Sequence, residues 1–175
     1  DDSVPSDELG KWYHWRGSTP FGGTPAADAA ATSPVRINEV IANSDGIVID
    51  AEVGRPFADG VAALERQNVA TEPPDILVIA LGTNGGTNAT SIDGLIAAAG
   101  DVDELIFVNV RVPRDWENAT NVALADAAGR YDHVRIVDWH AESAGGDHLF
   151  RADGYHPNEA GSERWANLIV IEVKS

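Results

Sequence analysis

Cysteine and methionine are both absent from this 175-residue chain. Without cysteine, neither a disulfide framework nor a thiolate metal site can form. Without methionine, the chain does not begin at a start codon, so we expect it to be a processed or excised piece. No apolar run reaches the roughly 18 residues that a membrane-spanning helix needs, and no signal peptide is recognisable. We expect any targeting segment or anchor to lie upstream of Asp1.

Basic residues are scarce: 12 lysines and arginines stand against 28 aspartates and glutamates, a formal net charge of −16. Nucleic acids and anionic lipid surfaces need a basic partner, so the charge argues against both. We interpret the excess as a solubilising acidic surface. The apolar fraction of 43% is typical of a globular protein, and the length fits one domain with its own core.

Residues 1–34 differ in composition from the rest of the chain. They contain three clustered aromatic residues, Trp12, Tyr13 and Trp15, followed by a stretch rich in glycine, proline, alanine and threonine. No helical or strand period runs through this stretch. We therefore divide the chain into an irregular N-terminal arm, 1–34, and a folded domain, 35–175.

Helical and strand patterns alternate along the folded domain. We expect helices over 35–42, 56–69, 91–99, 115–128 and 157–173, and strands over 47–50, 75–81, 104–110 and 134–139. The strand 75–81 is a continuous apolar run rather than an alternating one, which is typical of a buried strand. The segment 47–50 is a short apolar run bounded by Asp–Gly and acidic residues, and we expect a buried strand there as well. Such alternation predicts an α/β fold with a mostly parallel sheet covered by helices on both faces.

In a sheet of this kind, ligands bind beyond the carboxyl ends of the strands, so the loops there should carry the chemistry. The strand 75–81 is followed by three glycines, a threonine and Asn84 within 82–86. A sharp turn there can point the Asn84 amide over the sheet edge, as an oxyanion hole requires. The alternative is a plain glycine-rich turn.

Gly54 follows the strand 47–50 and precedes a helix. Its backbone N–H can face a developing negative charge close to a helix N-terminus. Tight packing is the alternative explanation for a glycine at this position.

Asp153 and His156 lie three residues apart, just before the last helix. At that spacing the carboxylate can reach the imidazole, fix its tautomer and stabilise the imidazolium, with the histidine as general base. An ordinary turn followed by a surface histidine is the alternative.

These segments together resemble the SGNH hydrolase family, and specifically the extracytoplasmic domain of the peptidoglycan O-acetyltransferases. The resemblance is carried by residues 49–55 (IDAEVGR), 80–85 (ALGTNG), 110–116 (VRVPRDW), 136–139 (IVDW), 153–157 (DGYHP) and 160–162 (AGS). The resemblance extends over about residues 35–172, and these segments keep the order and spacing that they have in the family. It implies a three-layer sandwich with a flavodoxin-like sheet.

The resemblance implies roles for six residues. Gly54 and Asn84 correspond to the oxyanion-hole donors of the family. Asp153 and His156 correspond to two members of its catalytic triad. The remaining two, Arg111 and Arg114, lie beside the site, where they either stabilise it or bind an acidic substrate. No cofactor is implied, and the other histidines have no metal-ligand spacing.

The nucleophile segment of the family, an apolar strand leading into Gly-Asp-Ser, is not found in this chain, so the opening strand is missing or replaced. Three serines compete for the role of nucleophile: Ser3, Ser18 and Ser33. Ser3 has the preceding aspartate but no strand before it. Ser18 follows a short possible strand, and Ser33 stands at nearly the right distance before Asp50.

Two functions follow from these observations. The first is a serine esterase or O-acyltransferase that acts outside the cytoplasm on acylated cell-envelope carbohydrate. The alternative is a catalytically degenerate accessory subunit that binds a larger membrane or envelope assembly through its N-terminal arm. A simple sugar-binding domain is a third reading, which the sequence favours no more than the second.

Overall fold

The computed structural model describes residues 39–43 and 46–175, and side chains from Val48 onwards. The strands are β1 (Glu39–Asn43), β2 (Gly46–Val48), β3 (Ile76–Ile79), β4 (Glu104–Val108) and β5 (Val134–Val137). The α-helices are α1 (Gly60–Arg66), α2 (Ala89–Ala99), α3 (Glu117–Arg130), α4 (Trp139–Glu142) and α5 (Glu159–Val173), and two short 3-10 helices are η3 (Phe57–Asp59) and η4 (Asp147–Leu149).

The strands form one sheet in the order β2-β1-β3-β4-β5. β3, β4 and β5 pair in parallel, while β1 is antiparallel to both of its neighbours, β2 and β3. Because β2 and β3 both oppose β1, they run in the same direction. β2, β3, β4 and β5 therefore end at one edge of the sheet, as the expectation of a mostly parallel sheet requires.

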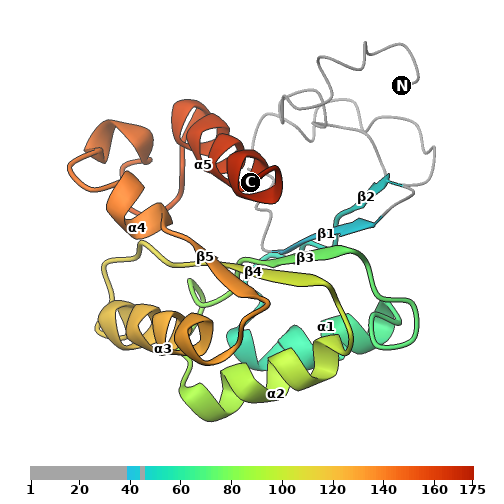
Figure 1. Ribbon diagram of the computed structural model, residues 1–175. Coiled ribbons are helices and arrows are strands. Elements are labelled where there is room, and N and C mark those ends of the chain that lie inside the picture. The colour runs from blue at the N-terminus through green and yellow to red at the C-terminus, as the bar shows by residue number, and fades with distance from the viewer. Residues whose placement is uncertain (1–38, 44–45) are drawn as a thin grey trace, which may run out of the picture.

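Helices cover both faces of this sheet, which gives three layers (Figure 1). α1, α2 and α3 pack on one face, and α5 with α4 lies on the other. Successive residues of β3 alternate between the two cores: Leu77 and Ile79 face α1, α2 and α3, whereas Val78 belongs to the cluster under α5. The continuous apolar run of β3 is thus buried on both sides, as the sequence predicts.

The helix expected over 35–42 is wrong where the structure describes it. Glu39–Asn43 is a strand that pairs with β2 on one side and β3 on the other. Hydrogen bonding to two neighbouring strands decides its conformation, and the local sequence does not encode those partners. A strand thus occupies the second position of the sheet, between β2 and β3, and it runs antiparallel to all the other strands.

Three further expectations need correction. The strand expected over 47–50 is an edge strand, Gly46–Val48, and Val48 is 40% exposed, so it is not buried. The helix expected over 56–69 is shorter and divided between η3 and α1. The short helices α4 and η4 were not expected, because a single turn carries no period that a sequence pattern can reveal.

The arm 1–34 lies outside the described residues, so the division into an arm and a domain stays a prediction. Within the described part of the chain, none of the helices has the length and apolar character needed to cross a bilayer.

Candidate active site

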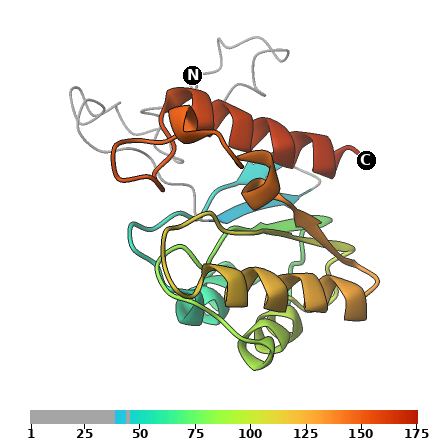
Figure 2. The same cartoon turned by 90° about the vertical axis from the view of Figure 1, so that its left-hand side faces the viewer.

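A cavity of about 320 Å³ lies where the loops after β2, β3 and β4 meet the turn before α5. It is lined by Gly54, Thr83, Asn84, Val112, Arg114, Trp116 and Tyr155. Figure 2 views the molecule from the side of this edge, with α5 above the sheet and α1, α2 and α3 below it. Three of the six site residues expected from the sequence, Gly54, Asn84 and Arg114, therefore line one cavity. Tyr155, which also lines it, belongs to the turn that carries Asp153 and His156.

Asp153 and His156 contact each other directly. Nδ1 of His156 lies 2.5 Å from Oδ2 of Asp153. The other carboxylate oxygen, Oδ1, accepts the backbone N–H groups of Tyr155 at 3.1 Å and of His156 at 2.9 Å. Gly154 has a φ of +78°, in the left-handed region that glycine adopts readily, and this permits so tight a turn.

The charge on Asp153 sets the tautomer of His156. Desolvation opposes ionisation of the Asp153 carboxyl, but the backbone N–H and ring of His156 outweigh it and lower the pKa to about 2. An ionised carboxylate only accepts hydrogen bonds, so Nδ1 of the neutral ring carries the proton and donates it. The lone pair then resides on Nε2, which can act as a base.

Nε2 of His156 is buried, and within 39–43 and 46–175 it has no hydrogen-bond partner. The whole His156 side chain is only 13% exposed. A buried polar atom of this kind is stabilised when a hydroxyl group reaches it, and leaving it unpaired costs about 1–3 kcal/mol. The geometry therefore suits a hydroxyl placed against Nε2.

Asn158 anchors this turn to α5. Its Oδ1 accepts the N–H of Gly161 at 3.1 Å, which caps the helix, and its Nδ2 donates to the carbonyls of His148 and Phe150 at 2.6 and 3.2 Å. A Cβ at Gly161 would lie 2.0 Å from the carbonyl oxygen of Leu149, so glycine permits this close approach. The role of Asn158 was missed from the sequence, although asparagine is a preferred residue at a helix N-cap.

The Gly54 loop is held by a buried arginine. Gly54 is exposed with a φ of +80°, and the next residue, Arg55, is 3% exposed. Nη2 of Arg55 donates to Asp50 at 2.6 Å and to Glu52 at 3.2 Å, and Asp50 also accepts Nε2 of Gln67 at 3.0 Å. Burial raises the pKa of Asp50, but the hydrogen bonds from Arg55 and Gln67 together with the nearby arginine charges outweigh burial, and the net shift is downward. Breaking such a pair is costly, so Arg55 fixes the position of Gly54.

The Asn84 loop is held from α3. Nε1 of Trp116 donates to the carbonyl of Gly82 at 3.1 Å, and a Cβ at Gly86 would lie 2.7 Å from Cβ of Trp116. The hydroxyl of Thr120 accepts the N–H of Thr87 at 3.3 Å. Among the described residues, the Asn84 side chain has no hydrogen-bond partner, which leaves its amide free to donate into the cavity.

Replacing Trp116 by phenylalanine is expected to loosen this loop without emptying the space beside Gly86. The variant loses the Nε1 bond to Gly82, so we expect the free energy of unfolding to fall by about 1 kcal/mol. The sequence predicts an esterase, and for that activity we expect kcat to fall about threefold to tenfold, since the Asn84 donor is then less precisely placed. Urea unfolding and steady-state kinetics measure both effects.

The control for this change is Trp165→Phe on α5, in the core on the other side of the sheet. That variant should lose stability with kcat unchanged. Equal kcat in the Trp116 variant and the parent protein would show that the bond to Gly82 does not position Asn84.

Arg111 and Arg114 both stack on aromatic rings beside the site. The guanidinium carbon of Arg111 lies 5.9 Å from the centre of the Phe150 ring, and that of Arg114 lies 5.9 Å from the centre of the Tyr155 ring. The Tyr155 ring in turn lies 4.0 Å from that of His156. The two arginines thus flank the turn that carries the histidine.

The three candidate nucleophiles, Ser3, Ser18 and Ser33, lie outside the described residues. His140 pairs with Glu117 at 3.2 Å, and His133 contacts the Tyr131 ring edge-on. Across 39–43 and 46–175 there is no group of three or more potential metal-binding side chains.

The chain is similar in sequence to part of several longer proteins named as O-acetyltransferases. The chain is 34% identical over 128 residues to the O-acetyltransferase OatA of Staphylococcus aureus (strain NCTC 8325 / PS 47). The aligned residues make up 73% of this chain and 21% of the relative. It is 28% identical over 157 residues to the peptidoglycan O-acetyltransferase OatA of Listeria monocytogenes, covering 81% of the chain and 25% of the relative. The chain therefore spans about a quarter or less of these relatives. No family model matches the sequence.

A solved structure supports the fold. The crystal structure of a serine-to-alanine mutant of an acetyl esterase, with an acetate ion, superposes with a TM-score of 0.50 at 26% identity. The superposition covers 69% of this chain and 67% of the esterase. These comparisons confirm the resemblance described from residues 49–162 and the α/β fold it implies.

Proposed function

We propose that this chain, an SGNH-hydrolase-like domain homologous to part of the peptidoglycan O-acetyltransferases, is a serine esterase or O-acyltransferase for acylated cell-envelope carbohydrate. One observation carries the proposal above all. Nδ1 of His156 is paired with Asp153, while the buried Nε2 is left without a described partner, and the ring contacts Tyr155, which lines the cavity. This is the arrangement of a general base that awaits a hydroxyl.

The residues support the following reaction. A serine hydroxyl gives its proton to Nε2 of His156 while its oxygen attacks the acyl carbon, and Asp153 stabilises the resulting imidazolium. The N–H of Gly54 and the amide of Asn84 donate to the oxyanion that forms. The imidazolium returns the proton to the departing alcohol, which leaves an acyl-serine. A water molecule or a second alcohol, deprotonated by His156, then takes the acyl group and frees the serine.

The substrate class follows from the relatives. Two of them are named as O-acetyltransferases, one specifically for peptidoglycan, and the solved neighbour is named as an acetyl esterase. We therefore assign an acylated carbohydrate of the cell envelope as the substrate and an extracytoplasmic location to the domain. None of these relatives is named as an accessory subunit, and no comparison supports that alternative.

A serine-directed fluorophosphonate tests the proposal, because it reacts only with a serine activated by a neighbouring base. We expect one label per chain, mapped by peptide mass spectrometry to Ser3, Ser18 or Ser33, and release of acetate from an O-acetylated saccharide. His156→Ala should prevent labelling. His148→Ala is the control, since His148 is exposed, and it should label normally. A chain that neither labels nor releases acetate would overturn the proposal.

A further inference from the structure

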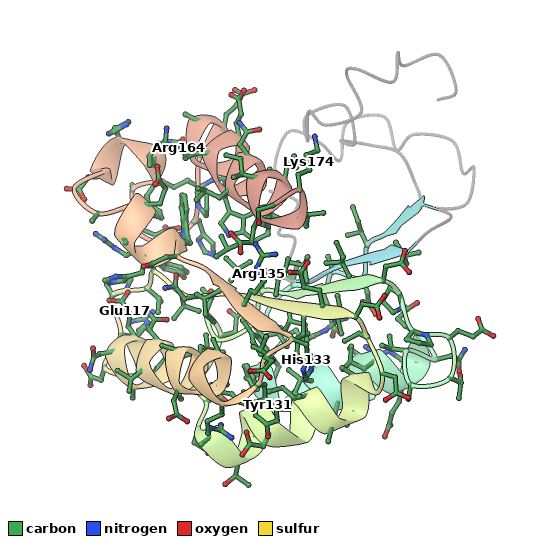
Figure 3. All side chains as sticks on the ribbon, viewed as in Figure 1. Glu117, Tyr131, His133, Arg135, Arg164 and Lys174 are labelled. Carbon is green, nitrogen blue, oxygen red and sulfur yellow. The ribbon has the colours of Figure 1, made fainter. Side chains whose placement is uncertain are left out.

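Seven of the eight arginines that the structure describes fall into two groups, and the eighth, Arg66 at the end of α1, makes no ion pair with another described residue. Those of the first group are ion-paired: Arg55 with Asp50 and Glu52, Arg130 with Asp93 and Asp126, Arg135 with Glu104 and Glu172, and Arg164 with Glu142. Figure 3 shows two of them, Arg135 on β5 facing α5 and Arg164 on α5. Of the five described arginines outside the candidate site, four are paired in this way.

The second group consists of Arg111, Arg114 and Arg151, and it surrounds the candidate active site. Within the described residues, none of the three has a carboxylate partner. Arg114 lines the cavity, and Arg111 stacks on Phe150. The backbone N–H of Arg151 donates to the carbonyl of His156 at 2.8 Å, which places Arg151 in the same turn as the histidine.

This distribution is not what the overall charge favours. The chain carries 28 acidic residues, yet the described part supplies no carboxylate to the guanidinium of Arg114. Arg114 instead lies over the face of the Tyr155 ring. A stacked guanidinium keeps its N–H donors free at its edge, and its charge remains available to a ligand. The cavity therefore presents a guanidinium that no described carboxylate contacts, in a protein with a formal net charge of −16.

We propose that Arg114 is a specificity-determining residue that binds a carboxylate on the carbohydrate substrate, with Arg111 adding to the local positive charge. The inference rests on the proposed function, since it concerns the substrate of the same site. Arginine suits this role because its planar fork of donors matches the two oxygens of a carboxylate. Arg114 lies beside Tyr155, whose ring contacts His156, so a substrate held there has its ester near the base.

A binding experiment on the full chain tests this without depending on turnover. The probes are N-acetylmuramic acid and N-acetylglucosamine, which differ by one carboxylate-bearing ether, and calorimetry or NMR titration gives the two dissociation constants. We expect the carboxylated sugar to bind about tenfold or more tightly at low salt, and the preference to shrink as salt is raised. Arg114→Gln should reduce the preference about tenfold, and Arg114→Lys should retain part of it.

Arg164→Gln is the matched control, because Arg164 is paired with Glu142 away from the cavity, and its preference should equal that of the parent. If Arg114 had only a structural role, its replacement would weaken the binding of both sugars equally and leave the preference unchanged. That result would overturn the inference. Equal binding of both sugars by the parent protein would overturn it as well. A chain that shows the preference but releases no acetate would contradict the proposed activity and leave this inference standing.

Discussion

Replacing His156 by alanine is expected to lower kcat/KM for ester hydrolysis on the order of 10⁴-fold. The reason is the position of its Nε2, which is buried and has no partner among the described residues, while Nδ1 is paired with Asp153 at 2.5 Å. Removing the ring removes the base that accepts the serine proton, and no other described histidine belongs to the turn that carries Tyr155 to the cavity wall. Steady-state hydrolysis of a small acetyl ester at pH 7 to 8 measures the loss.

The control is His148→Ala, which changes an exposed histidine in the neighbouring helix η4 and should retain the activity of the parent. The fold of both variants is checked by circular dichroism and urea unfolding. Since His156 contributes little to the two hydrophobic cores, its variant should remain folded. If the His156 variant hydrolysed the ester within tenfold of the parent, another group would be the base and the reaction scheme would be wrong.

The central part of the fold was predictable from local sequence, and the first strand was not. The continuous apolar run over 75–81 predicts a buried strand, and the pattern over 104–110 predicts the next strand; β3 and β4 confirm both predictions. The segment Glu39–Asn43 gives no such signal. Its conformation depends on pairing with β2 and β3, and β3 lies more than 30 residues further along the chain. Tertiary hydrogen bonds of this kind override a weak local preference.

The candidate site was likewise predictable only in part. Gly54, Asn84 and the Asp153–His156 pair stand at strand ends or before a helix, where the sequence shows turn residues, so their neighbourhood could be predicted. The residues that hold them in place could not. Trp116 reaches Gly82 across 34 residues, a contact that only the folded chain defines. The stacking of Arg114 on Tyr155 is likewise a long-range contact.

Replacing Asp153 by asparagine is the second change with a large expected effect, a fall in kcat of about 10³- to 10⁴-fold. The carboxylate accepts from Nδ1 of His156, whereas an asparagine amide turned toward the ring can donate to Nδ1 and move the proton to Nε2. That tautomer cannot accept the proton of the nucleophile. Steady-state kinetics give the loss, and ¹⁵N NMR of the imidazole shows which nitrogen is protonated.

The same substitution has a second, pH-dependent signature. Because the folded-state pKa of Asp153 is lowered to about 2, its ionisation stabilises the fold above the unfolded pKa, near 3.9. That contribution is lost as pH falls from about 4 through 2. The stability difference between the parent and Asp153→Asn should therefore be present at pH 6 and shrink below pH 4, as urea unfolding measures.

Asp147→Asn provides the matched comparison, because Asp147 is an exposed carboxylate in η4 for which the structure shows no ion pair among the described residues. It should change neither kcat nor the pH dependence of stability. Two results would contradict the role given to Asp153: a variant that retains the parent's kcat, or a stability difference that stays constant down to pH 2. The first would mean that the tautomer of His156 is fixed by another group. The second would mean that the contact between Asp153 and His156 does not stabilise the charged carboxylate.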